Sequence, residues 1–198
     1  MSQSQGDIQL NNSGVVAVMQ PYVFPYIGYF NLMACASHFV LYDDVNYIKQ
    51  GWISRNRILN NGNPLTFSVP ISQGSSNSQI NEVKTVNLER FKKKFLKTLE
   101  QAYAKAKYYD VGYEYVDEIL GSGENTISNI ARLSITYVSE ILEMNCKIYE
   151  SSKYFSETRG AGRSERLINI TKKLDCSTYV NSANGSSLYD KKQFECSG

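Results

Sequence analysis

Histidine and cysteine are scarce in this chain of 198 residues, which has one histidine, His38, and four widely spaced cysteines. No two cysteines form a C-x-x-C pair, and a lone histidine cannot complete any familiar zinc-ligand spacing with them. We therefore expect no metal site built from Cys and His. The sequence also lacks a Gly-x-Ser-x-Gly elbow, a Walker-type phosphate loop and a dinucleotide-binding glycine fingerprint, which sets aside those enzyme classes.

Long uncharged apolar runs are missing as well. No stretch approaches the roughly 20 apolar residues that a membrane-spanning helix needs. Residues 1–14 are polar and lack the basic and apolar regions of a signal peptide. We expect residues 1–14 to form a disordered leader, and we expect a cytoplasmic protein without a membrane span, whose thiols stay free.

Net charge is small, at +2, and gives no general reason to expect a nucleic-acid partner. The charges are unevenly distributed, however, because seven basic residues lie between Arg90 and Lys107 against Glu100 alone. Residues 110–143 carry seven acidic residues against Arg132 alone. Such blocks are usually solvated helix faces, and the alternative is a surface for an anionic partner.

Hydrophobic patterning predicts alternating strands and helices. Residues 15–19 and 38–42 are short, β-branched, apolar runs, and the helical segment between them makes a βαβ unit. Alternating apolar residues around Asn61-Gly62, a dipeptide suited to a type I′ turn, predict a β-hairpin over residues 53–72. Helical spacing and further apolar runs then predict helices at 88–106, 110–120, 127–141 and 163–174, and strands at 146–150 and 178–180. We expect one α/β domain over residues 15–198, a Rossmann-like three-layer arrangement with an inserted β-hairpin.

Polar side chains gather after the first two predicted strands, where open α/β sheets bind their ligands. They are Gln20 and Tyr22 after the first strand, and Asp43, Asp44, Asn46 and Tyr47 after the second. Trp52, Arg55, Asn56 and Arg57 follow soon afterwards. Aromatic faces pack on sugar rings, carboxylates and amides read hydroxyl groups, and Arg binds phosphate bidentately. The set suits a sugar joined to a phosphate.

Each of these residues also has a purely structural interpretation. If the strand continues, Asp43 and Asp44 point to opposite faces, so that at most one enters a crevice and the other caps a turn or meets solvent. Arg55 and Arg57 fall on one side of a strand with Asn56 opposite, which is also typical of a surface charge pattern. Trp52 suits a core position as well as a ligand platform.

Three motifs together closely resemble the WbqC-like protein family. They are Gln20-Pro-Tyr-Val-Phe-Pro-Tyr-Ile-Gly-Tyr-Phe30, Asp43-Asp-Val-Asn-Tyr47 and Gly51-Trp-Ile-Ser-Arg-Asn-Arg-Ile58. The resemblance runs from about residue 15 to the end and implies a role in O-antigen-type surface polysaccharide biosynthesis. Family members often carry Gly-x-Asp-Arg before the late helix, where this chain has Gly160-Ala-Gly-Arg-Ser-Glu-Arg166. The chain departs from the family pattern at this turn.

The resemblance and the residues together predict an acyl- or aminoacyltransferase acting on a nucleotide-linked amino sugar. In this hypothesis Arg55 and Arg57 hold phosphate, Trp52 and Tyr26 frame the sugar, and Asp43 or Asp44 accepts a proton. The expected donor is an acyl thioester of coenzyme A or of an acyl carrier protein, although no cofactor signature is evident in the residues. Two alternatives stay open: a non-catalytic sugar-nucleotide or glycan-binding assembly factor, and a glycosyltransferase holding a divalent metal on the Asp pair.

Overall fold

A computed structural model of the chain describes residues 14–72 and 77–198. The predicted leader lies outside these residues except for Gly14, which begins the first strand. The strands are β1 (Gly14–Met19), β2 (His38–Leu41), β3 (Arg55–Asn60), β4 (Asn63–Ser68), β5 (Lys147–Glu150) and β6 (Cys176–Val180). The α-helices are α1 (Ile27–Ala34), α2 (Leu88–Tyr103), α3 (Tyr109–Gly121), α4 (Ile127–Ile141), α5 (Ser151–Tyr154), α6 (Arg163–Lys173) and α7 (Lys191–Glu195). Short 3-10 segments lie at Ile80–Glu82, Ser156–Thr158 and Ala183–Leu188.

Four strands form a parallel sheet in the order β5-β2-β1-β6. The apolar, β-branched composition of β1 and β2 suits strands that are buried on both faces. Side chains of β1 alternate accordingly, since Ala17 packs on one face of the sheet while Val16 and Val18 pack on the other.

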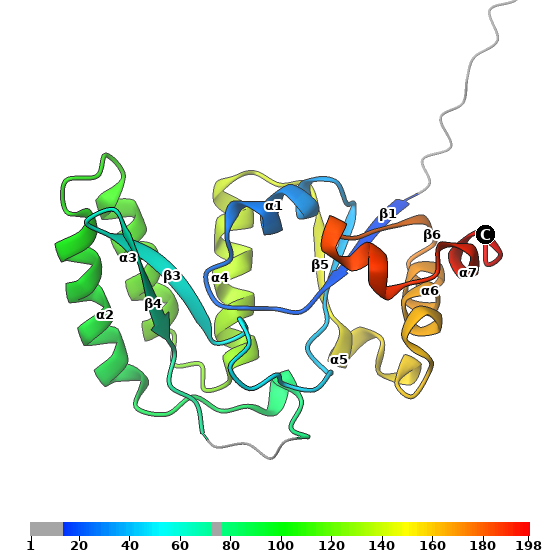
Figure 1. Cartoon of the computed structure of the whole chain (residues 1–198), viewed down its shortest axis with the longest axis horizontal. Coiled ribbons are helices and arrows are strands. Elements are labelled where there is room, and N and C mark those ends of the chain that lie inside the picture. The colour runs from blue at the N-terminus through cyan, green and yellow to red at the C-terminus, as the bar shows by residue number, and fades with distance from the viewer. Residues whose placement is uncertain (1–13, 73–76) are drawn as a thin grey trace, which may run out of the picture.

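Helices cover both faces of this sheet. Tyr29, Phe30 and Met33 of α1 pack with Ile135 of α4 against the first face. Leu167 and Ile170 of α6 pack against the second, beside α7 at the right of Figure 1. This layering of helix, sheet and helix confirms the predicted Rossmann-like α/β fold.

The second sheet is the inserted hairpin β3–β4, whose strands pair antiparallel from Arg55↔Ser68 to Asn60↔Asn63. Both turn residues have positive φ, 49° at Asn61 and 77° at Gly62, as a type I′ turn requires. The hairpin predicted from Asn61-Gly62 is therefore confirmed.

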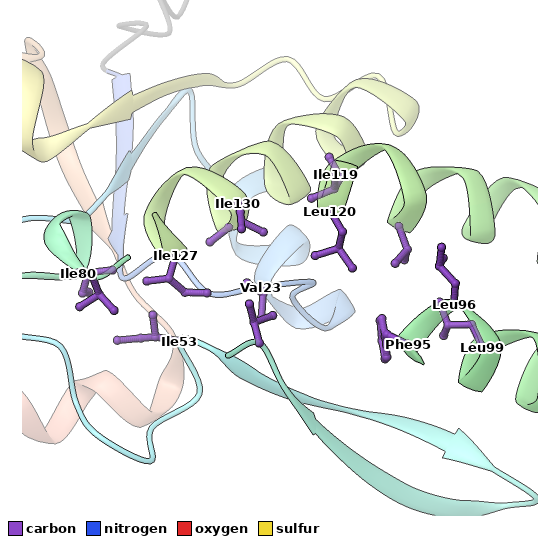
Figure 2. Packing of buried hydrophobic residues seen from close by; sticks show 14 residues of the cluster. Val23, Ile53, Ile80, Phe95, Leu96, Leu99, Ile119, Leu120, Ile127 and Ile130 are labelled. Carbon is purple, nitrogen blue, oxygen red and sulfur yellow. The ribbon is translucent and has the colours of Figure 1, made fainter. Parts of the chain in front are cut away.

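The hairpin, α2, α3 and one side of α4 form a lobe that extends from the parallel sheet (Figure 1). Figure 2 shows its core, in which Phe95 and Leu99 of α2 face Leu120 of α3. Val23 and Ile53 join this core from the segments that follow β1 and β2, so the lobe is continuous with the end of the parallel sheet. In the part of the chain that the structure describes, no helix is both long enough and apolar enough to cross a membrane.

Candidate functional site

The carboxyl ends of β2 and β5 lie side by side, because these two strands pair directly. The chain returns to β5 through α4 on one face of the sheet and leaves β5 for α6 on the other. Open α/β sheets bind ligands outside the carboxyl ends of their strands. Asp43 and Asp44 follow β2 at this point, and Ser151 and Ser152 follow β5.

Asp44 is the centre of a buried polar cluster. Its Oδ2 accepts hydrogen bonds of 2.7 Å from Nε of Arg159 and 2.7 Å from Nη2 of Arg166. Its Oδ1 accepts a second contact from Arg166, at 2.8 Å, and the Ser151 hydroxyl. Two cations and a hydroxyl therefore surround a carboxylate that is itself buried.

Burial alone raises the pKa of Asp44, but the hydrogen bonds from Ser151, Arg159 and Arg166 and the charge of Arg166 hold the pKa below its ordinary value. A general base needs a raised pKa and a free oxygen that faces the substrate. Asp44 has a lowered pKa, and both of its oxygens are engaged. Its geometry favours an anchoring role over the proton-accepting role that the sequence suggested.

Asp43 is bound by uncharged donors instead. It accepts hydrogen bonds from the Ser152 backbone N–H at 2.9 Å and the Ser152 hydroxyl at 2.7 Å, and it lies 3.1 Å from the Ser151 hydroxyl. The expectation that Asp43 and Asp44 point to opposite faces required the strand to continue through both residues, and it does not. Strand β2 ends at Leu41, so strand alternation no longer applies, and both carboxylates reach Ser151.

Arg159 and Arg166 were not among the residues selected from the sequence. Arg166 is buried in α6 beside Leu167 and Ile170 and lies 4.6 Å from the ring centroid of Tyr42. It occupies the same helical stripe as Ile170, four residues later. A cation on an apolar stripe needs a buried anionic partner, and this signal could have linked α6 to the Asp pair.

Trp52 carries a second cluster, on the connection between β2 and β3. The Arg57 guanidinium lies 4.9 Å and the Arg55 guanidinium 5.9 Å from the centroid of the Trp52 ring. This confirms that both arginines share one side of the strand. Trp52 is 51% exposed, so it lies at the surface and is not a core residue. Arg55 is also fixed by its Nε, which donates to the Gly51 carbonyl at 3.0 Å.

Asn56 points the other way and ties the hairpin to the segment after β1. Its Nδ2 donates to the carbonyls of Val23 at 3.2 Å and Phe24 at 2.6 Å. Phe24 has a φ of 49°, so this amide stabilises a left-handed backbone position. These contacts give Asn56 a structural role, and its predicted ligand contact stays a prediction.

The remaining predicted residues are spread along the same two segments. Tyr22 packs edge-on against Tyr29 with ring centroids 5.2 Å apart, and burial raises its pKa to about 12. The Tyr47 hydroxyl is 2.7 Å from that of Ser54, and the Gln20 carbonyl accepts the Tyr29 hydroxyl at 3.4 Å. Tyr26, which is 64% exposed, and Asn46 lie at the surface.

The predicted site is thus divided into two clusters, one centred on Asp44 and one on Trp52. Among the described residues, no hydrogen bond, ion pair or ring contact joins the two. Asp44 and Trp52 both lie on the connection that follows β2. The Val23 N–H, in the segment after β1, donates to the carbonyl of Ile53, the residue next to Trp52, at 3.0 Å. Both clusters therefore belong to the carboxyl end of the parallel sheet.

Comparison with known proteins agrees with the motifs. The sequence model of the WbqC-like protein family matches residues 20–198. The chain is similar to "Uncharacterized protein Rv1507c" of Mycobacterium tuberculosis (strain ATCC 25618 / H37Rv), with 26% identity over 182 residues. That alignment covers 91% of this chain and 77% of the relative. No solved structure matches the chain significantly.

Proposed function

The chain belongs to the WbqC-like protein family, and from this premise we propose that it transfers an acyl or aminoacyl group to a nucleotide-linked amino sugar. The product serves surface polysaccharide of the O-antigen type. The observation that carries the proposal is the exposed Trp52 ring with the Arg55 and Arg57 guanidiniums stacked on it.

This cluster has the chemistry that a sugar joined to a phosphate requires. An aromatic face can pack on a sugar ring, and exposed guanidiniums bind phosphate through charge-assisted, bidentate hydrogen bonds. Arg57 is the more available of the two cations, because it is exposed, whereas the Nε of Arg55 is held by Gly51. We assign the diphosphate to Arg57 and Arg55 and the sugar to Trp52 and Tyr26.

The Asp44 cluster supplies the second half of the proposed site. Arg159 meets Asp44 through Nε, and 41% of its side chain is exposed at the carboxyl edge. The buried Asp44 carboxylate orients the half-exposed Arg159 guanidinium, which is then preorganised to bind a negatively charged group of a ligand. We assign Asp44 to hold Arg159 in place and Arg159 to bind a negative group of the substrate or donor.

Asp43 is the carboxylate assigned to proton transfer because, unlike Asp44, it contacts no cation among the described residues. Both of its oxygens are also engaged, but the Ser152 hydroxyl that donates to Oδ2 can relay a proton to it. The sugar amine attacks the carbonyl of an acyl thioester, supplied by coenzyme A or an acyl carrier protein, and the C–S bond breaks. The proton of the amine passes through the Ser152 hydroxyl to Asp43. The departing thiolate takes up this proton from Asp43, which returns Asp43 to its carboxylate form.

A thermal-shift screen of the protein against nucleotide-linked amino sugars, free nucleotides and acyl donors tests this function. A ligand that binds only the folded state raises the unfolding midpoint by mass action. We expect a shift with one amino sugar that Arg57→Ala abolishes, and turnover with a thioester donor that Asp43→Asn abolishes.

The outcomes separate the transferase from its two alternatives. Binding without turnover, with every donor class tried, would favour a non-catalytic sugar-nucleotide or glycan-binding factor. Nucleotide binding that depends on a divalent metal would favour a glycosyltransferase, and Asp44→Asn would then abolish that dependence. If Asp43→Asn and Asp44→Asn both leave turnover intact, the assignment of proton transfer to this pair is wrong.

A further inference from the structure

The far end of the lobe exposes apolar side chains from two separate elements. We call this end the lobe tip: residues 59–65 around the β3–β4 turn, residues 104–108 between α2 and α3, and the first turn of α3. Figure 1 shows these segments together, at the opposite end of the molecule from α6 and α7. The Tyr103 hydroxyl joins them by accepting the Leu59 backbone N–H at 2.7 Å.

The exposed fractions at the lobe tip are large for apolar and aromatic residues. Tyr108 is 69% exposed and Val111 51%, and on the hairpin Leu59 is 56% and Leu65 39% exposed. Single exposed hydrophobic residues are normal on a protein, but several on one protruding end indicate an interaction surface.

A tyrosine-lined pocket of about 400 Å³ opens at the same place. Its lining comes from the end of α2 and the start of α3, and it includes Tyr103, Lys107, Tyr108, Tyr109 and Tyr113. The Lys107 ammonium lies 4.9 Å from the centroid of the Tyr108 ring at its rim. The pocket therefore combines an aromatic and apolar wall with a cation at its mouth.

The outer face of α2 continues this surface with positive charge. Arg90, Lys94 and Lys97 fall on one helical stripe, and Lys93 lies beside them. This stripe is opposite the buried Phe95 and Leu99. Within residues 14–72 and 77–198, none of these four cations forms an ion pair, whereas Lys92 on the inner side pairs with Asp117 at 3.0 Å.

From these observations we propose that the lobe tip and the outer face of α2 bind a membrane surface that carries anionic lipid. Tyrosine rings and aliphatic side chains suit the boundary between headgroups and acyl chains, and lysines attract anionic headgroups. The pocket would take an apolar segment of a lipid, with Lys107 beside its phosphate. Helix α6, which carries Arg166 of the Asp44 cluster, lies at the opposite end of the molecule from the tip, so the cluster stays free when the tip is docked (Figure 1).

Two other kinds of partner, a protein and a nucleic acid, fit these residues less well. Protein–protein interfaces are depleted in lysine, whereas lysines dominate this surface. Nucleic-acid backbones are bound mainly by cations and polar groups, and they leave exposed Leu59 and Val111 without a partner. An anionic bilayer satisfies the charges and the apolar residues together.

Vesicle flotation of the full chain tests the proposal. Vesicles of phosphatidylcholine with phosphatidylglycerol are compared with vesicles of phosphatidylcholine alone, at low and high salt. We expect binding only to the anionic vesicles, weakened by salt because the attraction is screened. Lys93→Glu/Lys94→Glu/Lys97→Glu should weaken binding about a hundredfold or more, since each lysine contributes about 1 kcal/mol near an anionic surface.

A matched variant, Lys84→Glu/Lys172→Glu/Lys192→Glu, changes net charge equally at exposed positions outside α2 and should lose far less affinity. Tyr108→Ser/Val111→Ser should weaken binding without changing its salt dependence. The proposal is overturned if the wild type ignores anionic vesicles, or if both lysine variants lose affinity equally. It is also overturned if the stripe binds a soluble polyanion such as heparin while vesicles are ignored. None of these measurements depends on transferase activity.

Discussion

Nη2 of Arg166 lies 2.8 Å from Oδ1 and 2.7 Å from Oδ2 of Asp44, a carboxylate 122 residues earlier in the chain. Both residues are buried, with exposed fractions of 6% and 4%. The contact joins α6 to the end of β2 and fixes the second layer of helices at the carboxyl edge of the sheet. It is therefore a part of the fold as well as of the candidate site.

Loss of Arg166 should be costly, because the buried Asp44 carboxylate then keeps only the half-exposed Arg159 as a cationic partner. We expect Arg166→Met to lower the free energy of unfolding by about 3–5 kcal/mol, measured by urea denaturation. Arg163→Met, an exposed position on the same helix, should change it by less than about 0.5 kcal/mol. Equal effects of the two substitutions would show that the Asp44 contact contributes little to stability.

Acid should remove the contribution of Asp44 to stability. Its pKa is lower in the folded chain than the ordinary value of 3.8, so between the two values the unfolded chain binds more protons. The stabilisation is present above pH 3.8 and is lost as the pH falls through the folded pKa. Unfolding free energies of the wild type and of Asp44→Asn, measured from neutral pH downward, should differ most above this window and converge below it. A constant difference across the window would contradict the lowered pKa.

Much of the fold could be predicted because its signals are local. The β-branched runs that became β1 and β2, the Asn61-Gly62 turn and the apolar stripe of α2 depend on residues close in sequence. Helix α7 was not predicted, because it depends on contacts between residues that are not neighbours in the sequence. It is five residues long and lies where Phe194 stacks on Tyr179, with ring centroids 5.4 Å apart, a contact made only by the folded chain.

The candidate site was predicted in place but not in detail. Sequence placed Asp43 and Asp44 at the end of a strand, which is correct, but their partners come from α5 and α6. Arg159 and Arg166 are separated from them by more than a hundred residues. Pairing between such distant residues follows from the order of strands in the sheet, which the pattern of a single sequence does not specify.

Asn56 offers a test that separates a structural residue from a binding residue. Asn56→Ala removes the donors to the Val23 and Phe24 carbonyls, so we expect a loss of about 1–2 kcal/mol in unfolding free energy. Hydrogen exchange around residues 22–24 should become faster. Asn60→Ala, in the same strand, is the control and should leave that segment protected. A stable Asn56→Ala that loses only ligand affinity would instead support the ligand contact expected from sequence.

Thiol reactivity should follow burial. Cys35 and Cys196 are exposed, whereas burial raises the pKa of Cys146 to about 11 and also raises the pKa of Cys176. The thiolate is the reactive form, so a maleimide at neutral pH should label Cys35 and Cys196 first. Mass mapping of the labelled peptides measures the order, and labelling in urea should abolish the differences. Early labelling of Cys176 in the folded chain would mean that the His38 imidazole, 3.5 Å from its sulfur, activates the thiol despite burial.

Trp52 is the only tryptophan of the chain, so its fluorescence reports directly on the proposed sugar-phosphate platform. Titration with a nucleotide-linked amino sugar should change the emission, because the ligand replaces water over a half-exposed ring. Arg57→Ala should weaken this binding about tenfold to a hundredfold, the loss of one charge-assisted hydrogen bond of about 1.5–3 kcal/mol. Arg57 is exposed, so the free energy of unfolding of Arg57→Ala should hardly change.

Lys49→Ala removes an exposed cation from the same connection and should leave the affinity near that of the wild type. If the two substitutions weaken binding equally, general electrostatic attraction explains the result, and the stacked guanidinium has no specific role.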